Sequence, residues 1–328
     1  MLGEKKRFAE TLTRQRLDTM TEDDFLKALF DRLPSPSGKL VIPPGDDCAG
    51  YSLGGGKILL VAVDQIVEKR HYLADGPHTA TPEQAGRKLL ARNLSDIAAM
   101  GGKPRFCLVA ASLGAGHDER WLDRFFNGIL ALGKKYNVDL IGGDLATAPK
   151  DTVAALTIIG EADSKNVCRR SGARAGDFLF ATGKFGRSFQ TGHHLSFEPR
   201  VKEGQWLARH RFSRAMIDVS DGLLIDALRL CRASGVGLQL NTAAIPRRTA
   251  GTTVDEALND GEDHELLFAV SKRKAKDLTE TWPFARVAVT KIGEFFSAEI
   301  PVIVDGRGVR LSGLTMGGFD HFKTRSRR

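Results

Sequence analysis

The sequence predicts an α+β protein with two domains, and three observations lead to this expectation. The chain has 328 residues, which is long for one ordinary core and suits two. Apolar runs typical of strands alternate with helical stretches, but without the strict βαβ rhythm of a Rossmann sheet. A basic, glycine-bearing segment at 164–177 has the composition of a loop. We therefore place the boundary near residue 162 and expect domains at 1–162 and 163–328.

The first half of the chain carries the signals of three helices and four strands. Residues 22–33 fit a short helix capped by Thr21, with an inward apolar face made of Phe25, Leu26, Leu29, Phe30 and Leu33. A loop rich in Pro and Ser follows, and the glycines within 53–57 indicate a hairpin turn. Thr81 and Pro82 open a helix that ends at Gly101–Gly102, and 119–135 is also helical. Apolar runs predict strands at 57–63, 105–112, 138–141 and 153–161.

The second half continues in the same style. Strands are expected at 177–183, 215–217, 237–241, 265–270, 286–295 and 301–304. After the second of these, Leu224, Ala227, Leu228 and Cys231 recur at helical spacing, and Gly235 ends that helix.

Composition excludes several classes of protein. Hydrophobic residues make up 42% of the chain and aromatic residues 7%, which is typical of a globular protein. Four cysteines lie far apart without a C-x-x-C pair, so neither a zinc knuckle nor a disulfide framework is indicated. The N-terminus has no apolar signal region, and no apolar run approaches ~18 residues. We therefore expect a cytoplasmic protein without a membrane span.

The net charge of +8 allows two functional interpretations. A basic protein can bind nucleic acid, or it can attract small anionic substrates. A solvated basic tail is the commonest reason for such charge. Because the sequence has no helix-turn-helix, zinc finger or RNA-binding aromatic signature, nucleic acid stays a minor alternative.

Carboxylates gather where strands end and where one helix is apolar. Asp64 and Asp144 follow the strands 57–63 and 138–141, Asp46 and Asp47 follow the proline loop, and Asp218 and Asp221 flank the start of helix 222–234. Asp96 and Asn93 fall inside the apolar arc of helix 82–100. A helix cap at Asp221 or Ser220, or a core hydrogen-bond hub at Asp96, explains one carboxylate but not seven. A group of oxygens without His or Cys is typical of a Mg²⁺ site, with Ser220 and the helix N-terminus beside it to meet a phosphate.

Familiar catalytic motifs are missing. No G-x-x-x-x-G-K-[ST] segment is present, so phosphate would be met instead at glycine-rich turns such as Gly142–Gly143 and Gly101–Gly102. His193 and His194 lack metal-ligand spacing, and we expect both at the surface.

Seven segments together resemble the thiamine-monophosphate kinase family. They are GDD (45–47), NLSDIAAMG (93–101), IGGD (141–144), RSGARAGD (170–177), IDVSDGL (217–223), GEDHELLF (261–268) and GFDHF (318–322). The resemblance covers the chain from about residue 22 to 322. It implies a fold like that of aminoimidazole ribonucleotide synthetase, with an N-terminal ATP- and Mg²⁺-binding domain that dimerises through its sheet. The C-terminal domain would cover the nucleotide and the substrate.

The resemblance also implies roles for individual residues. Asp46, Asp64, Asp96, Asp218 and Asp221 match the family's Mg²⁺ ligands. Its ATP contacts are matched by Gly143, Asp144, Arg170 and Ser220, and its thiamine phosphate contacts by His71, Glu262 and Phe319. The sequence departs from the family pattern at Ala62–Val63, where hydroxyl residues are usual, and at Leu145–Ala146–Thr147, where a cation is usual. Phe319 replaces Tyr or Trp, and the segment between Arg187 and His193 is short.

The expected reaction is phosphorylation of thiamine monophosphate by ATP, through direct in-line transfer assisted by Mg²⁺. Its acceptor is already ionised at pH 7, so no general base is needed, and Asp221 and Arg170 are the candidate catalytic residues. The apolar strands 57–63 and 105–112 indicate a homodimer. Two alternatives stay open, namely an ATP-using enzyme of the same fold with another acceptor, and a non-catalytic nucleotide-binding or basic interaction protein.

Overall fold

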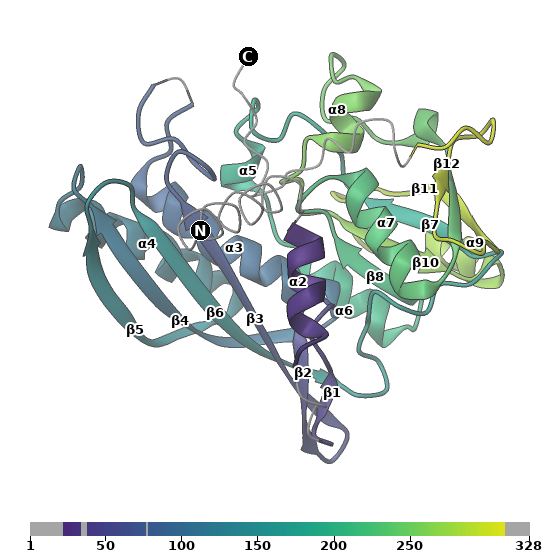
Figure 1. The fold of residues 1–328 in the computed structure, drawn as a ribbon, viewed down its shortest axis with the longest axis horizontal. Helices are drawn as coiled ribbons and strands as arrows, with labels where there is room; N and C mark the ends of the chain where they lie inside the picture. Colours follow the sequence, from purple (N-terminus) through teal and green to yellow (C-terminus); the bar gives the residue numbers. More distant parts are fainter. Residues whose placement is uncertain (1–21, 34–37, 77, 312–328) are drawn as a thin grey trace, which may run out of the picture.

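The computed structural model describes residues 22–33, 38–76 and 78–311 and shows two six-stranded sheets side by side (Figure 1). The first sheet has the order β1 (Leu40–Ile42), β2 (Ala49–Gly54), β3 (Lys57–Val67), β6 (Val153–Asp163), β4 (Lys103–Gly114) and β5 (Asp139–Ala148). The helices of this half are α2 (Glu22–Phe30), α3 (Pro82–Ala99) and α4 (Glu119–Tyr136). Among the described strands of this sheet, β4 and β5 run parallel, and all other neighbouring strands run antiparallel.

The second sheet is formed by the C-terminal half. Its order is β12 (Ile303–Val304), β9 (Gly237–Leu240), β11 (Val289–Phe296), β7 (Phe178–Thr182), β10 (Leu266–Val270) and β8 (Ser213–Asp218). Its helices are α5 (His193–Ser196), α6 (Val201–Arg209), α7 (Leu223–Ser234), α8 (Val254–Asn259) and α9 (Lys272–Thr281), with a 3₁₀ turn at Thr242–Ala244. Mixed sheets with helices packed on them confirm the α+β prediction.

Helix α3 is the central element of the molecule. Thr81 and Gln84 close a capping box at its start, and Pro82 occupies its first turn, as the sequence predicts. The helix packs on β3 and β6 of the first sheet, on α4, and on α6 and β8 of the second half. It is therefore covered by both halves, and polar side chains on it need partners there.

The second sheet contributes to two cores. Met216, Phe180 and Phe268 point into the core that also contains α3 and α6. Ile217 and Leu267 belong to the other core, together with the α7 stripe Leu224, Ala227, Leu228 and Cys231. Because neighbouring residues of a strand point to opposite faces, one face of the second sheet packs against the first half and the other face packs against α7. The predicted apolar stripe of α7 is confirmed.

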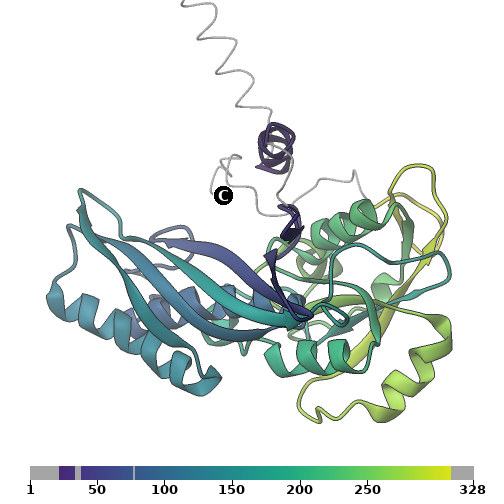
Figure 2. The ribbon, with the colours of Figure 1, turned by 90° about the horizontal axis from the view of Figure 1, so that it is seen from below.

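One face of the first sheet is open. Figure 2 shows α3 and α4 along one face, and no described helix lies along the other. Leu59, Val61 and Thr157 on that open face are partly exposed, and Val63 is 65% exposed. Among the described residues, no helix combines the length and apolar character that a membrane crossing requires.

Two strands run past the carboxylates that are predicted to end them. Strand β3 continues past Asp64 to Val67, and β5 continues past Asp144 to Ala148, so neither carboxylate ends its strand. Both strands keep neighbours over the added length, because β3 pairs with β6 to Val153 and β5 pairs with β4 to Gly114. Gly142 and Gly143 consequently lie within β5 and do not form a turn.

The inward face predicted for helix 22–33 is wrong. Helix α2 ends at Phe30, and Phe25, Leu29 and Leu33 are 43%, 39% and 49% exposed. The helix projects from the two-sheet body instead of packing into it (Figure 2). Thr21, its predicted cap, lies outside the described residues. Strand β1 falls within a segment predicted to be loop, whereas the hairpin turn between β2 and β3 is confirmed.

A pair of glycines fixes the distance between α3 and α4. A Cβ at Gly128 would overlap the carbonyl of Glu83, and one at Gly86 would overlap the carbonyl of Phe125. We expect Gly128→Ala to lower the free energy of unfolding by about 1–3 kcal/mol, because the helices must separate. Urea denaturation measures this. Gly116→Ala is the matched control, since a Cβ there meets nothing within 4 Å. Equal stability of the two variants would contradict the close approach.

Candidate active site

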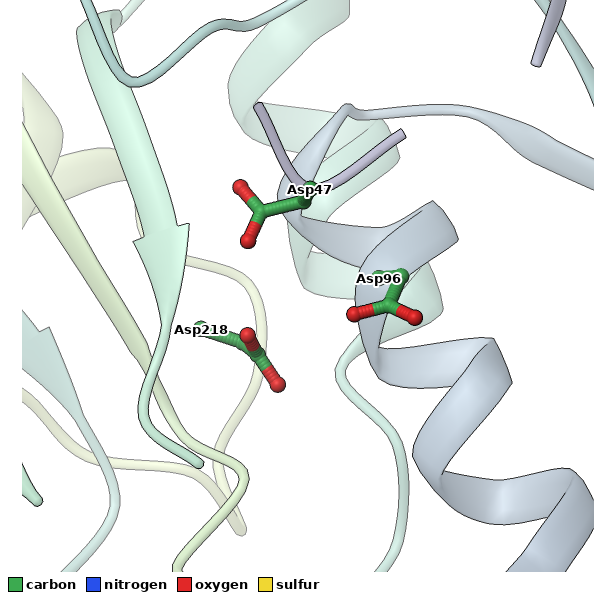
Figure 3. A group of neighbouring side chains, drawn as sticks. All are labelled: Asp47, Asp96 and Asp218. Carbon is green, nitrogen blue, oxygen red and sulfur yellow. The ribbon is translucent and has the colours of Figure 1, made fainter. Parts of the chain in front are cut away.

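Three carboxylates meet between the two sheets. Asp47 follows the proline loop, Asp96 lies on α3 and Asp218 is the last residue of β8, as predicted for its strand. One oxygen from each lies within 4.8 Å of the others. Figure 3 shows the three side chains directed toward a common space. We call Asp47, Asp96 and Asp218 the carboxylate trio.

The trio carries an electrostatic conflict. Burial raises the pKa of Asp47 to about 7, with the Arg170 charge opposing and the Asp218 charge adding to the rise. Burial and the charges of Asp64 and Asp218 hold the pKa of Asp96 well above its usual range. For Asp218 the effect of burial is outweighed by hydrogen bonds with His264 (3.3 Å) and Ser95 (2.6 Å), which lower its pKa. Three ionised carboxylates at this distance repel one another unless a proton or a cation lies between them.

The donor atoms of the trio fit a hard divalent cation. All are carboxylate oxygens, which Mg²⁺ prefers over nitrogen or sulfur ligands. Asp47 Oδ2 is buried and has no hydrogen-bond partner among the described residues. A buried carboxylate oxygen without a donor is costly, and a bound cation would remove that cost.

Asp46 and Arg170 flank the trio. The Arg170 guanidinium donates to Asp47 Oδ1 at 2.7 Å, and the Arg170 backbone N–H donates to Asp46 Oδ1 at 3.1 Å. Arg170 Nε is buried without a partner among the described residues. Asp46 thus positions the loop that carries Arg170, and Arg170 keeps a donor to offer.

A small pocket of about 110 Å³ is linked to the trio by His264, which lines the pocket and lies 3.3 Å from Asp218 Oδ2 through its Nδ1. Four residues singled out from the sequence line it, namely His71, Ser220, Asp221 and Glu262. Its remaining lining residues are Arg70, Arg92, Phe189, Asp260, Gly261 and His264. The segments 70–71, 220–221 and 260–264 are far apart in the sequence, and the fold brings them together here.

A fully buried lysine supports Glu262 in this pocket. Lys88 Nζ donates to both Glu262 oxygens at 2.8 and 2.7 Å and lies 2.9 Å from His194 Nδ1. Burial lowers the pKa of Lys88 to about 8, with Glu262 opposing. Burial alone would raise the pKa of Glu262, but Lys88, His194 and Arg92 hold it well below its usual value. The pair is therefore ionised at neutral pH.

The entrance to α7 is organised by Asp226. Its Oδ2 accepts the backbone N–H groups of Ser220, Asp221 and Gly222 at 3.1, 3.1 and 3.2 Å. These N–H groups are consequently not free to meet a phosphate, contrary to the expectation from sequence. Asp221 pairs with Arg229 at 2.5 Å, and α7 has no side-chain cap. The capping interpretation of Asp221 or Ser220 is therefore wrong.

Other residues singled out from the sequence lie elsewhere. Three of the predicted metal ligands, Asp46, Asp64 and Asp221, are not part of the trio. Asp64 pairs instead with Arg92. Asp144 on β5 pairs with Ala110 on β4. The preceding residue of β4, Val109, pairs with Leu156 on β6, and Leu156 in turn pairs with Asp64 on β3. By strand alternation Asp144 faces the open side of the sheet, opposite to Asp64. Gly143 lies beside it on edge strand β5, and Phe319 is outside the described residues.

Sequence reasoning missed several residues of this site. The sequence places Asp47 among seven candidate carboxylates, but the family resemblance assigns the metal to Asp46, and no role in the site is predicted for Lys88, Arg92, His194 or Asp226. Lys88, Arg92 and Asp96 follow one another at intervals of four on a buried helix, which is the signal that would have found them. The surface position expected for His194 is wrong, since it is fully buried against Phe189 and Lys88.

Known proteins resemble this chain over nearly its whole length. The sequence model of the AIR synthase related protein N-terminal domain matches residues 45–162, and that of the C-terminal domain matches 175–305. Thiamine-monophosphate kinase of Salmonella typhimurium is 32% identical over 333 residues, which cover 92% of this chain and 98% of that protein. The Bacillus subtilis enzyme of the same name is 32% identical, covering 85% and 93%.

The fold agrees with these relatives. The structure of AaThiL complexed with AMPPCP and TMP aligns with a TM-score of 0.77 at 24% identity, covering 92% of this chain and 97% of that chain.

The ionised state of Glu262 generates a pH-dependent prediction. Its pKa is lowered on folding, so its stabilising effect is fully present above its unfolded pKa of about 4.5 and is lost progressively as the pH falls below that value toward the lower folded pKa. Near neutral pH, Glu262→Gln should cost about 3–5 kcal/mol of unfolding free energy, because Lys88 is left unpaired. We expect the difference from the unsubstituted protein to shrink below about pH 4.5 in urea denaturation.

The double variant Lys88→Met/Glu262→Gln is the control for this experiment. It removes both charges, so the pH dependence that comes from the pair should disappear. A stability difference for Glu262→Gln that stays constant down to about pH 3 would show that the carboxylate is not held in its ionised form.

Proposed function

This chain belongs to the AIR synthase related proteins and, within them, to the thiamine-monophosphate kinase family, and we propose that it transfers the γ-phosphoryl group of ATP to thiamine monophosphate with the help of Mg²⁺. The observation that carries this proposal is the position of the carboxylate trio beside a pocket that contains His71 and Glu262. AaThiL, which shares the fold, was captured with AMPPCP and TMP. Its complex supports a nucleotide and a thiamine phosphate as the pair of ligands here.

The residues of the chain suggest how charge is managed. Asp47, Asp96 and Asp218 would hold Mg²⁺, which when bound neutralises phosphate charge between ATP and the acceptor. Arg170 offers its unpartnered Nε to a phosphate oxygen. Asp46 holds the Arg170 loop, so this donor is positioned before substrate arrives, and Asp226 fixes the Ser220 loop in the pocket wall.

The acceptor side needs recognition rather than proton transfer. The phosphate of thiamine monophosphate is ionised at neutral pH, so in-line attack needs no general base. Glu262, kept ionised by Lys88, is a strong acceptor for an amino group of the substrate. His71 receives the Val67 backbone N–H at Nδ1 (2.9 Å), which fixes its ring in the pocket wall.

The two halves of the chain have different parts in this proposal. We assign metal binding and dimerisation to 1–162, and closure over the nucleotide and the acceptor to 163–328. Asp218 and Glu262 reach the site from the second half, so neither half would be active alone.

The adjacent pair Asp46 and Asp47 provides a sharp test of the metal site. Asp47→Asn should lower the rate of thiamine diphosphate formation from ATP and thiamine monophosphate by at least about 100-fold, because it removes a trio oxygen. Chelation with EDTA should abolish the reaction. Chromatography of the thiamine phosphates gives both rates.

Asp46→Asn is the matched control, since its side chain contacts the Arg170 loop and lies outside the trio. It should retain considerably more activity than Asp47→Asn. Greater loss at Asp46 would favour the assignment made from the sequence. Measurable ATP binding without thiamine diphosphate would instead point to a different acceptor.

The open face of the first sheet supports a homodimer. It is apolar at Val61, Val63 and Leu108, and no described helix covers it. Asp144 also lies on this face, pointing away from the trio of its own chain. If Gly143 and Asp144 contact ATP, as the resemblance implies, they would do so in the site of a second copy.

Val63 is a suitable position to test this assembly. We expect a dimer by light scattering at micromolar concentration, and Val63→Glu should weaken the dimer at least about tenfold by placing an unpaired charge in the contact. The control is Leu130→Glu on α4, where the side chain is also exposed but lies on the helical side of the sheet. A monomeric unsubstituted protein would refute the assembly.

A further inference from the structure

Arg92 is the charged side chain that the mechanism above leaves without a role. It lies on α3, one turn from Asp96 and one turn from Lys88. Its Nε donates to Asp64 Oδ2 at 3.0 Å and its Nη2 donates to Asp64 Oδ1 at 3.3 Å. Its Nη1 lies 3.8 Å from Glu262 Oε1. The guanidinium therefore lies between two carboxylates, held by a two-point contact on one side.

Both carboxylate oxygens of Asp64 accept hydrogen bonds from Arg92. The Asp64 backbone N–H donates to Asn93 Oδ1 at 3.2 Å, which fixes the strand against α3. The preceding residues of β3, Ala62 and Val63, have no side-chain oxygen that could help Asp64 to hold a cation. A paired guanidinium provides at Asp64 the positive charge that a metal ion would otherwise supply.

Arg92 also lines the pocket, together with His71, Glu262, Ser220 and Asp221. The negative charges around it already have partners. Glu262 is bound by Lys88, and Asp221 by Arg229. Among the described residues, Arg92 Nη1 donates no hydrogen bond, so this group is available to a ligand in the pocket.

We propose that Arg92 is a catalytic residue whose Nη1 binds the phosphate group of the acceptor, and that Asp64 is a positioning residue for Arg92 rather than a metal ligand. This proposal rests on the proposed function. Arg92 shares the pocket with residues assigned to the acceptor (His71 and Glu262) and to ATP (Ser220), which suits a cation that draws two phosphates together.

The step itself is balanced without a further reactant. An ionised oxygen of the acceptor phosphate forms a bond to the γ-phosphorus of ATP. The bond between that phosphorus and the bridging oxygen breaks, and its electron pair leaves with ADP. No proton is transferred. Arg92 offsets the repulsion as the two anions approach, and it does so before the bond is made.

The test compares ligands with and without the phosphate. Calorimetry without nucleotide or metal measures binding of thiamine monophosphate and of thiamine. The main variant is Asp64→Asn/Arg92→Met, which removes both charges of the pair and leaves no unpaired carboxylate. We expect it to bind thiamine monophosphate at least about tenfold more weakly and thiamine within about twofold of the unsubstituted protein. Arg92→Lys should lose part of the affinity, because an ammonium cannot hold Asp64 at two points while reaching the ligand.

Arg124→Met is the matched control. Arg124 makes a similar two-point contact with Glu83, but on the surface of α4 and away from the pocket. It should leave both affinities unchanged. If the double variant does not fold by circular dichroism, Arg92→Lys retains the charge and supplies the same comparison.

Asp64→Asn separates the two roles of Asp64. A positioning role predicts weaker binding of thiamine monophosphate with an unchanged Mg²⁺ concentration for half-maximal turnover. A metal-ligand role predicts the opposite, and that result would overturn the assignment of Asp64. Equal affinities of the double variant and the unsubstituted protein for thiamine monophosphate would overturn the role of Arg92. Failure of the unsubstituted protein to bind thiamine monophosphate at all would refute the proposed function, and the Arg92 proposal with it.

Discussion

The enclosure of three charged side chains on one helix, one fully buried and two half-buried, is the constraint on which this structure depends. Lys88, Arg92 and Asp96 are spaced four residues apart on α3, which is enclosed by both halves of the molecule. A buried charge is tolerated only with a partner, and the partners come from different sheets. Asp64 on β3 compensates Arg92, and Glu262 from the second half compensates Lys88. Asp96 instead meets the like charge of Asp218 from the second half, so this contact needs a proton or a cation between the two carboxylates. The relative position of the halves is therefore set by electrostatics as much as by apolar packing.

The loop that supplies Glu262 shows how firmly this arrangement is held. Glu262 and His264 both adopt left-handed backbone conformations, with φ of 55° and 49°, which non-glycine residues rarely do. Their backbone N–H groups donate to the carbonyls of Ser220 and Val219 at 2.7 and 2.8 Å. The loop is thus attached to the segment between β8 and α7. Such strain is maintained only where surrounding contacts determine the conformation, and it is commonly found at functional sites.

Periodicity allowed most elements to be predicted, and its limits explain the errors. Apolar runs predict where the strands lie, but a carboxylate inside β3 or β5 resembles a strand end because pairing across the sheet is not visible locally. Asp96 was recognised from its place in an apolar arc. Asp46 and Asp47 are both candidates from the sequence, and only the family resemblance favours Asp46, because adjacent loop residues have no periodicity that says which one points inward. Lys88 and His194 resemble surface residues in composition, and only tertiary contacts account for their burial.

The regular spacing on α3 and the alternation on β3 restrict how the chain can change in length. With the earlier part of β3 held in register, removing one residue before Asp64 would turn the Asp64 side chain to the open face of the sheet, and Gln65 would take its place beside the helix. Removing one residue between Lys88 and Asp96 would rotate the later side chain by about 100° around the helix axis. Insertions and deletions in related sequences are therefore compatible with this site only outside these two elements. The number of residues in each becomes a criterion for deciding which relatives share the same chemistry.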